Sequence, residues 1–108
     1  MAYDEQLAGR IREILGRREF SEKKMFGGLA FLVGGNMAVA ASGQGGILVR
    51  VDPEESDALV RKGPATLMEM RGRSMTGWLR VDAAHLSKPA DLEAWVIRGV
   101  RYAESLPR

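Results

Sequence analysis

The uncharged stretch from Leu29 to Val49 constrains the fold of this chain more than any other feature. It is long enough to cross a bilayer as a helix. It is interrupted, however, by Gly34-Gly35-Asn36 and again between Ser42 and Gly46. Clusters of glycine with small polar residues are typical of turns, and glycine gives the backbone the freedom that a tight hairpin needs. We therefore expect three short strands, over 29–33, 37–41 and 47–51, instead of a membrane span.

Three helices are expected around these strands. An amphipathic pattern between Asp4 and Gly16 predicts the first helix. The pair Asp52-Pro53 is typical of a helix start, so a short second helix should follow it. The last helix, from about Pro89 to Leu106, has the strongest signal in the chain. Its apolar positions follow a three-four rhythm on one side, at Leu92, Trp95, Val96, Gly99, Tyr102, Ala103 and Leu106.

Two further strands are expected over 67–71 and 77–82. Residues 20–26 are expected to be extended but are not counted in the sheet. Short turns between strands imply antiparallel pairing, and amphipathic helices must cover an apolar sheet face. The predicted fold class is therefore α+β, with one domain over 1–108. It is expected to be a two-layer α/β sandwich with a five-stranded antiparallel sheet, in the order α-β3-α-β2-α.

The composition limits the chemistry that the chain can perform. Its 108 residues include no cysteine, which excludes disulfides, thiolate catalysis and cysteine zinc sites. The net charge of +2 is too small to require nucleic acid as a partner. His85 is the only histidine, and its sequence neighbours form neither a catalytic triad nor a metal site. We expect no enzymatic activity, catalytic residue, cofactor or metal. The acidic first residues are unlike a signal peptide, so we expect a cytoplasmic protein without a membrane partner.

Alternation along the strands predicts two different sheet faces. The first is large and apolar and should meet the helices, with Leu29, Phe31, Val33, Met37, Val39, Ala41, Ile47, Val49, Val51, Met68, Met70, Leu79 and Val81. The second mixes small apolar residues with a tryptophan and charged residues, namely Ala30, Leu32, Ala38, Ala40, Leu48, Arg50, Glu69, Arg71, Trp78 and Arg80.

The second face is too apolar for a solvated surface and too charged for a core. Tryptophan and arginine are enriched at the centres of protein interfaces. We therefore predict that this face binds another protein or a second copy of the chain. The predicted interaction residues are Leu48, Arg50, Arg71, Arg73, Trp78 and Arg80. The alternative is a sheet face that loops of the same chain cover.

Two other functions stay open at this point. The segment from Arg61 to Arg80 is basic and contains Trp78, a combination that can hold single-stranded nucleic acid by charge and stacking. Such a module would use Arg50, Arg71, Arg73, Trp78 and Arg80. The other function is a small-ligand or enzymatic role, in a pocket under the loop 42–46. The glycines of this loop lead into a strand and not into a helix, which disfavours a phosphate cradle.

Two groups of residues resemble the N-terminal domain of the TfoX (Sxy) family. The first is Met25-Phe26-Gly27-Gly28, followed by Gly35-Asn36-Met37 and by Leu48–Val51. The second runs from Gly72 to Trp78 and is followed by the helix that contains Trp95. In this order, the resemblance covers nearly the whole chain.

The resemblance implies a fold like that of the type III secretion chaperones and a regulatory role without catalysis. TfoX is a positive regulator of competence genes that is thought to act with a transcription activator. The implied partner is therefore a protein of the transcription machinery, and nucleic acid is not favoured. Many proteins with this fold dimerise, which implies a homodimer. Within the motif, Phe26 is expected to plug the core, while Gly27 and Gly28 permit a bend or a bulge.

Overall fold

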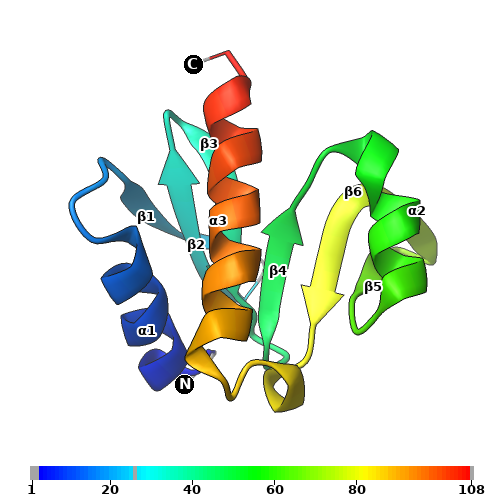
Figure 1. Cartoon of the computed structure of the whole chain (residues 1–108), viewed down its shortest axis with the longest axis horizontal. Helices are drawn as coiled ribbons and strands as arrows, with labels where there is room; N and C mark the ends of the chain where they lie inside the picture. The colour runs from blue at the N-terminus through cyan, green and yellow to red at the C-terminus, as the bar shows by residue number, and fades with distance from the viewer. Residues whose placement is uncertain (1–2, 26, 108) are drawn as a thin grey trace.

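The computed structural model describes residues 3–25 and 27–107 (Figure 1). The chain forms, in order, α1 (Glu5–Leu15), β1 (Ser21–Met25), β2 (Gly28–Val33), β3 (Asn36–Ala41), β4 (Ile47–Arg50), α2 (Pro53–Lys62), β5 (Thr66–Met70), β6 (Arg73–Val81), the short 3-10 helix η1 (Ala83–His85) and α3 (Pro89–Ser105). The strands make one antiparallel sheet in the order β1-β2-β3-β4-β6-β5. The mixed α/β class, the antiparallel sheet and the three α-helices are confirmed. No helix in these described residues is long and apolar enough to cross a membrane.

The sheet has six strands, so the prediction of five was wrong. The additional strand is β1, which pairs with β2 at one edge of the sheet. Its first four residues are exposed, and three of them are the charged Glu22, Lys23 and Lys24. An edge strand does not have to alternate apolar and polar residues, and charges on such an edge discourage pairing with other chains. This strand therefore lacked the pattern by which the other strands were predicted.

The first turns of α1 and α2 are capped by the side chain that precedes each helix. The carboxylate of Asp4 accepts hydrogen bonds from the backbone N–H groups of Gln6 and Leu7, at 2.9 and 3.2 Å. The carboxylate of Asp52 accepts one from the N–H of Glu54 at 2.9 Å. Each bond satisfies a donor that has no partner within the helix.

An ion pair connects α1 with the edge strand β1. The guanidinium of Arg12 donates to both carboxylate oxygens of Glu22, at 2.6 and 3.0 Å. These hydrogen bonds, together with the positive charge, hold the pKa of Glu22 below its ordinary value of 4.5. The same bonds raise the pKa of Arg12.

The main core lies between the sheet and the helices. In Figure 1, α1 and α3 lie in front of the sheet, on the viewer's side. They contribute Leu7, Ile11, Leu15, Leu92, Val96 and Val100 to a cluster with the strand residues Phe31, Val39, Val49, Leu79 and Val81. Leu59 and Val60 of α2 pack against this cluster. Gly99 lets α3 approach β3 closely, because a Cβ there would collide with the carbonyl oxygen of Ala38.

Irregular pairing moves several residues to the other face from the one predicted. Met37 and Met68 were expected to face the helices, but they belong to a second cluster that also contains Leu48. Ala38, expected on the second face, belongs to the main core. The register shifts between Phe31 and Leu32 and again between Leu67 and Met68. The first shift places one extra residue in β3, which inverts the alternation beyond it and exchanges the faces of Met37 and Ala38. The second shift places the extra residues in β6, whereas β5 alternates regularly, with Leu67 toward the main core and Met68 on the second face. Met70, which follows the second shift, lines the same hollow as Met68, described below.

The tight hairpin predicted at Gly34-Gly35-Asn36 is confirmed. Val33 pairs with Asn36, and the two glycines between them have φ of 61° and 84°. A two-residue turn with positive φ at both positions matches the twist of the strands that it joins. The β5–β6 hairpin has the same design at Arg71 and Gly72, with φ of 55° and 77°.

Candidate binding surface on the second sheet face

The second sheet face has a small core of its own. Ala30, Met37, Ala40 and Leu48 are buried there, and Met25, Leu32, Met68 and Trp78 pack around them. All of these residues lie on strands, so among the described residues no helix side chain belongs to this cluster. Leu48 is only 5% exposed. Of the predicted interaction residues, Leu48 is therefore a packing residue within this chain and not an accessible contact.

The pairing of β4 with β6 brings four predicted residues together. Leu48 lies opposite Arg80, and Arg50 lies opposite Trp78. Residues opposite each other on neighbouring antiparallel strands have side chains close enough to interact. Alternation of side chains along each strand was sufficient to predict that these residues share a face, because the register between β4 and β6 is regular over these pairs.

Arg50 lies between two aromatic rings. Its guanidinium carbon is 5.0 Å from the ring centre of Trp78 and 5.6 Å from that of Tyr102 on α3. Both distances are within the range of a cation–π interaction. Tyr102 was predicted only as a core residue of the last helix. Its contact with Arg50 joins the end of β4 to α3, and no spacing along the sequence indicates it.

Arg80 holds the loop between β3 and β4. Its guanidinium donates to the hydroxyl of Ser42 at 2.9 Å and to the carbonyl of Gly45 at 3.1 Å. Within the loop, the N–H of Ser42 donates to the carbonyl of Gly46 at 3.0 Å. Gly46 is required at its position, because its φ is 69° and a Cβ would collide with the carbonyl oxygen of Val81. Arg80 thus has a structural partner in this chain, besides its place on the predicted face.

A hollow of about 310 Å³ opens beside Arg80 on the second face. Its lining comes from every strand of the sheet or its adjoining loops, with Met25, Gly28, Ala40, Ala41, Ser42, Gln44, Leu48, Met68, Glu69, Met70, Arg71 and Arg80. The loop 42–46 forms part of its wall, where a pocket was predicted. The predicted residue Arg71 lines this hollow, whereas Arg73 is exposed at the start of β6.

The motif residues have separate structural roles. Gly27 has φ of 74° between β1 and β2, which fits the expected bend. Gly28 lets β2 approach β3, since a Cβ would collide with the carbonyl oxygen of Ala41. Gly35 is in the β2–β3 turn, and the side-chain amide of Asn36 donates to the carbonyl of Pro107 at 3.0 Å. Met25 lines the hollow, and the core role expected for Phe26 lies outside the described residues.

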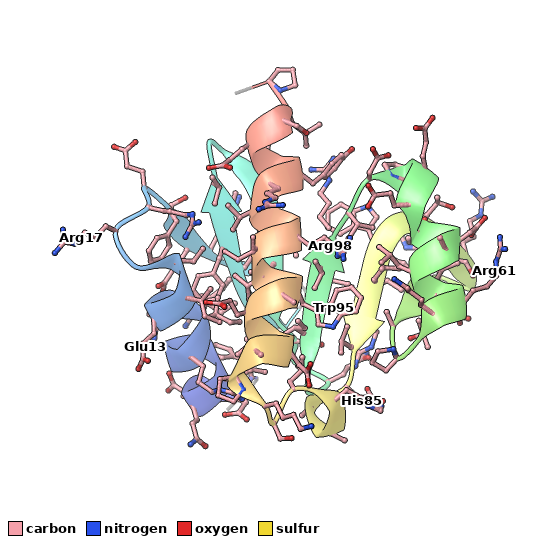
Figure 2. The ribbon with its side chains drawn as sticks, in the orientation of Figure 1. Glu13, Arg17, Arg61, His85, Trp95 and Arg98 are labelled. Carbon is pink, nitrogen blue, oxygen red and sulfur yellow. The ribbon has the colours of Figure 1, made fainter. Side chains whose placement is uncertain are left out.

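The basic residues between Arg61 and Arg80 do not come from a single element. Arg61 and Lys62 are in the last turn of α2, where Figure 2 shows Arg61 pointing outward. Arg71 and Arg73 are at the β5–β6 hairpin. The charge that suggested a nucleic-acid surface is thus divided between a helix end, a hairpin and β6.

A second pair of tryptophan and arginine lies on α3. The guanidinium carbon of Arg98 is 5.7 Å from the ring centre of Trp95, and both side chains extend from the side of α3 that faces α2 (Figure 2). His85 is exposed on η1 at one end of the molecule. Within residues 3–25 and 27–107, no three His, Cys, Asp or Glu side chains are close enough to hold a metal ion.

Comparison with protein families gives one result. The model of the TfoX N-terminal domain matches residues 13–103 of this chain. Comparisons with curated proteins and with solved structures find no significant match. The family match covers α1 from Glu13 onward, all six strands, α2 and most of α3. This chain therefore belongs to the TfoX N-terminal domain family.

Proposed function

We propose that this chain is a non-enzymatic interaction domain that acts in the regulation of competence and transcription, in the cytoplasm. It contacts a protein of the transcription machinery and works as a homodimer. The family match supports the regulatory class. The observation that carries the interaction site is the pair of Arg50 and Trp78 on the second sheet face. The helices join the main core from the other face, which supports the two-layer, secretion-chaperone-like arrangement expected for this family.

The Arg50–Trp78 pair has the chemistry of an interface centre. Tryptophan and arginine dominate the residues whose truncation weakens binding most. Arg50 is held between Trp78 and Tyr102, so a partner that binds it does not have to order a free side chain. Trp78 is half-buried and rests against the small core of the second face. It can therefore present part of its ring without unfolding its surroundings.

The test compares the two tryptophans. Trp78→Ala should weaken self-association by about thirtyfold or more, because truncated interface centres cost about 2 kcal/mol or more. The matched control is Trp95→Ala, which removes the same side chain from a similar contact with Arg98 on α3. Light scattering and sedimentation across a concentration series measure the dimer, with circular dichroism to verify folding. A monomeric wild type, or equal effects of the two variants, would contradict the proposed dimer surface.

The transcription partner is tested by capture from cell extract with immobilised wild type, Trp78→Ala and Trp95→Ala. We expect a subunit or activator of the transcription machinery to be retained by the wild type and by Trp95→Ala, and to be lost with Trp78→Ala. Recovery of the same proteins by all three would move the contact away from Trp78.

Nucleic acid is the alternative ligand of the same pair, because a base could stack on Trp78 beside the guanidinium of Arg50. A titration of fluorescent single-stranded DNA at low salt separates the two functions. We expect no saturable binding. Binding that weakens steeply with salt, and that Trp78→Ala removes, would replace the protein partner by nucleic acid.

A further inference from the structure

The hollow on the second sheet face is separate from the Arg50–Trp78 pair, since neither of these residues lines it. Its volume of about 310 Å³ is at the lower end of the range for small-molecule sites. Its wall combines apolar side chains from several strands with a few polar groups, a composition typical of ligand pockets.

The greater part of the lining is apolar and adaptable. Ala40 and Leu48 are buried members of the second cluster, and Met25 and Met68 pack around them. Met70 adds a third methionine to the wall. Methionine is unbranched and polarizable, so it adjusts to apolar ligands of different shapes. This part of the hollow would take a flexible hydrocarbon group.

The polar groups favour a negative charge. The lining contains Arg71 and Arg80 against the single acidic residue Glu69. The side chain of Arg80 is 21% exposed, and its two hydrogen bonds to the loop use only part of its five N–H donors. Its ion pair with Asp82 is long, at 3.8 Å, and Asp82 is 76% exposed, so this contact leaves donors of Arg80 for a ligand. The hydroxyl of Ser42 and the amide of Gln44 border the hollow beside it. Arginine binds carboxylates strongly because its planar donors can meet both oxygens.

The backbone at Arg71 gives an independent indication. Its φ of 55° is the only positive φ at a non-glycine residue in the described chain. A hairpin turn of this type prefers asparagine or glycine at that position, and arginine is strained there. Strain of this kind is characteristic of positions whose side chain has a function. Arg71 lines the hollow, where asparagine or glycine would not supply a positive charge.

We propose that this hollow binds a small amphipathic carboxylate, such as a medium-chain fatty acid. The hydrocarbon group lies against Met25, Met68 and Met70, and the carboxylate meets Arg71 and Arg80. This inference goes beyond the proposed interaction role. Its charged contacts are Arg71 and Arg80, whereas the Arg50–Trp78 pair carries the interaction role, so either proposal can fail without the other.

The probe for the test is octanoate, titrated into the full chain and followed by amide NMR and by calorimetry. We expect saturable one-to-one binding, with the largest shifts at Ser42–Gly46 and along β5. Octanol, which has the same chain and no charge, should bind about tenfold more weakly, because hydrogen bonds to a charged group are the stronger ones. Failure to saturate in the millimolar range, or equal affinities of octanoate and octanol, would overturn the proposal.

Two hairpin variants locate the carboxylate. Arg71→Asn removes one charge and keeps a residue that tolerates positive φ, so the hairpin should fold. Arg73→Asn removes the same charge two residues later, from a side chain that does not line the hollow. We expect Arg71→Asn to weaken octanoate binding about tenfold and Arg73→Asn to leave it nearly unchanged. Equal losses would mean that only the overall charge attracts octanoate, and no loss with Arg71→Asn would place the carboxylate elsewhere. Either result overturns this assignment.

Discussion

The two faces of the sheet bury their apolar residues in different ways. On the helix side, Phe31 and Leu79 are fully buried in a cluster to which α1 and α3 contribute. On the second face, Leu48 is buried in a cluster of strand residues. The first face is packed mainly by leucine, isoleucine, valine and phenylalanine side chains, beside several alanines, and it meets the helices. The second uses alanines with methionines around them, and it leaves a hollow. Both faces of this sheet therefore bury apolar residues, and the hollow on the second face is lined by adaptable apolar side chains from the strands beside charged ones.

The largest expected effect is on the helix-covered face. Phe31→Ala should lower the free energy of unfolding by about 3–5 kcal/mol, because it removes a large buried ring and leaves a cavity among α1, α3 and the sheet. Urea denaturation followed by circular dichroism measures this loss. A loss below about 1 kcal/mol would be typical of a surface position and would contradict the packing described for this face.

The matching substitution on the second face should cost less. Leu48→Ala is expected to lower the free energy of unfolding by about 2–3 kcal/mol, near the lower end for buried leucines, because the methionines around it can move into the space. The same denaturation experiment applies. A loss as large as that of Phe31→Ala would show that the second face is packed as rigidly as the first.

Two helical glycines should respond to substitution by alanine with opposite changes in stability. Gly99→Ala should destabilise by about 1–3 kcal/mol, because its methyl group would collide with the backbone of Ala38 and push α3 away from β3. At Gly9 in α1, nothing lies within 4 Å of the position that a methyl group would take. Gly9→Ala should therefore stabilise the chain by about 0.5–1 kcal/mol, through helix propensity alone. Thermal unfolding of both variants measures the difference, and effects of the same sign would contradict the close contact of α3.

The smallest expected effect is at the α1–β1 ion pair. Glu22→Gln should cost less than about 1 kcal/mol near neutral pH, because the side chains of Arg12 and Glu22 are 41% and 30% exposed and water weakens the pair. The pKa of Glu22 is lowered in the folded chain, so its contribution is complete above its ordinary pKa of 4.5. It is lost as the pH falls through the lowered folded-state value.

The measurement is the difference in unfolding free energy between wild type and Glu22→Gln, followed from neutral to strongly acidic pH. We expect this difference to shrink on acidification. Glu13→Gln is the control, because Glu13 is exposed on α1 and belongs to no ion pair of the described residues. An equal pH dependence for both variants would mean that the contact with Arg12 is not responsible.

Sequence patterns predicted much of this fold, for identifiable reasons. The α1 and α3 helices have continuous apolar stripes, and Asp52-Pro53 begins α2 as expected. The glycines at 34 and 35 allow only a turn between β2 and β3, and the alternation along β4 and β6 placed Arg50, Trp78 and Arg80 on one face. In each case the signal is local, because it depends on residues that are only a few positions apart in the sequence.

The errors arose where the pairing partner decides the outcome. The face of Met37 depends on a register shift, which is a property of two strands together and not of either one. The face of Met68 depends on the pairing of its neighbour Leu67 with Leu79, which directs Leu67 toward the main core. The edge strand β1 has no apolar alternation and forms because β2 offers it hydrogen bonds. The contact of Arg50 with Tyr102 joins residues that are far apart in sequence.

The sequence by itself determined the three helices, the strands other than β1, the tight hairpin at residues 34–36 and the family, because helix periodicity, glycine conformation and short motifs act over neighbouring residues. Only the tertiary structure decided which side chains the second face buries and which line its hollow. That outcome depends on strand register and on how β1 and β5, at opposite edges of the sheet, both contribute to one hollow. Both depend on contacts between residues far apart in the sequence, so no short segment of the sequence predicts them.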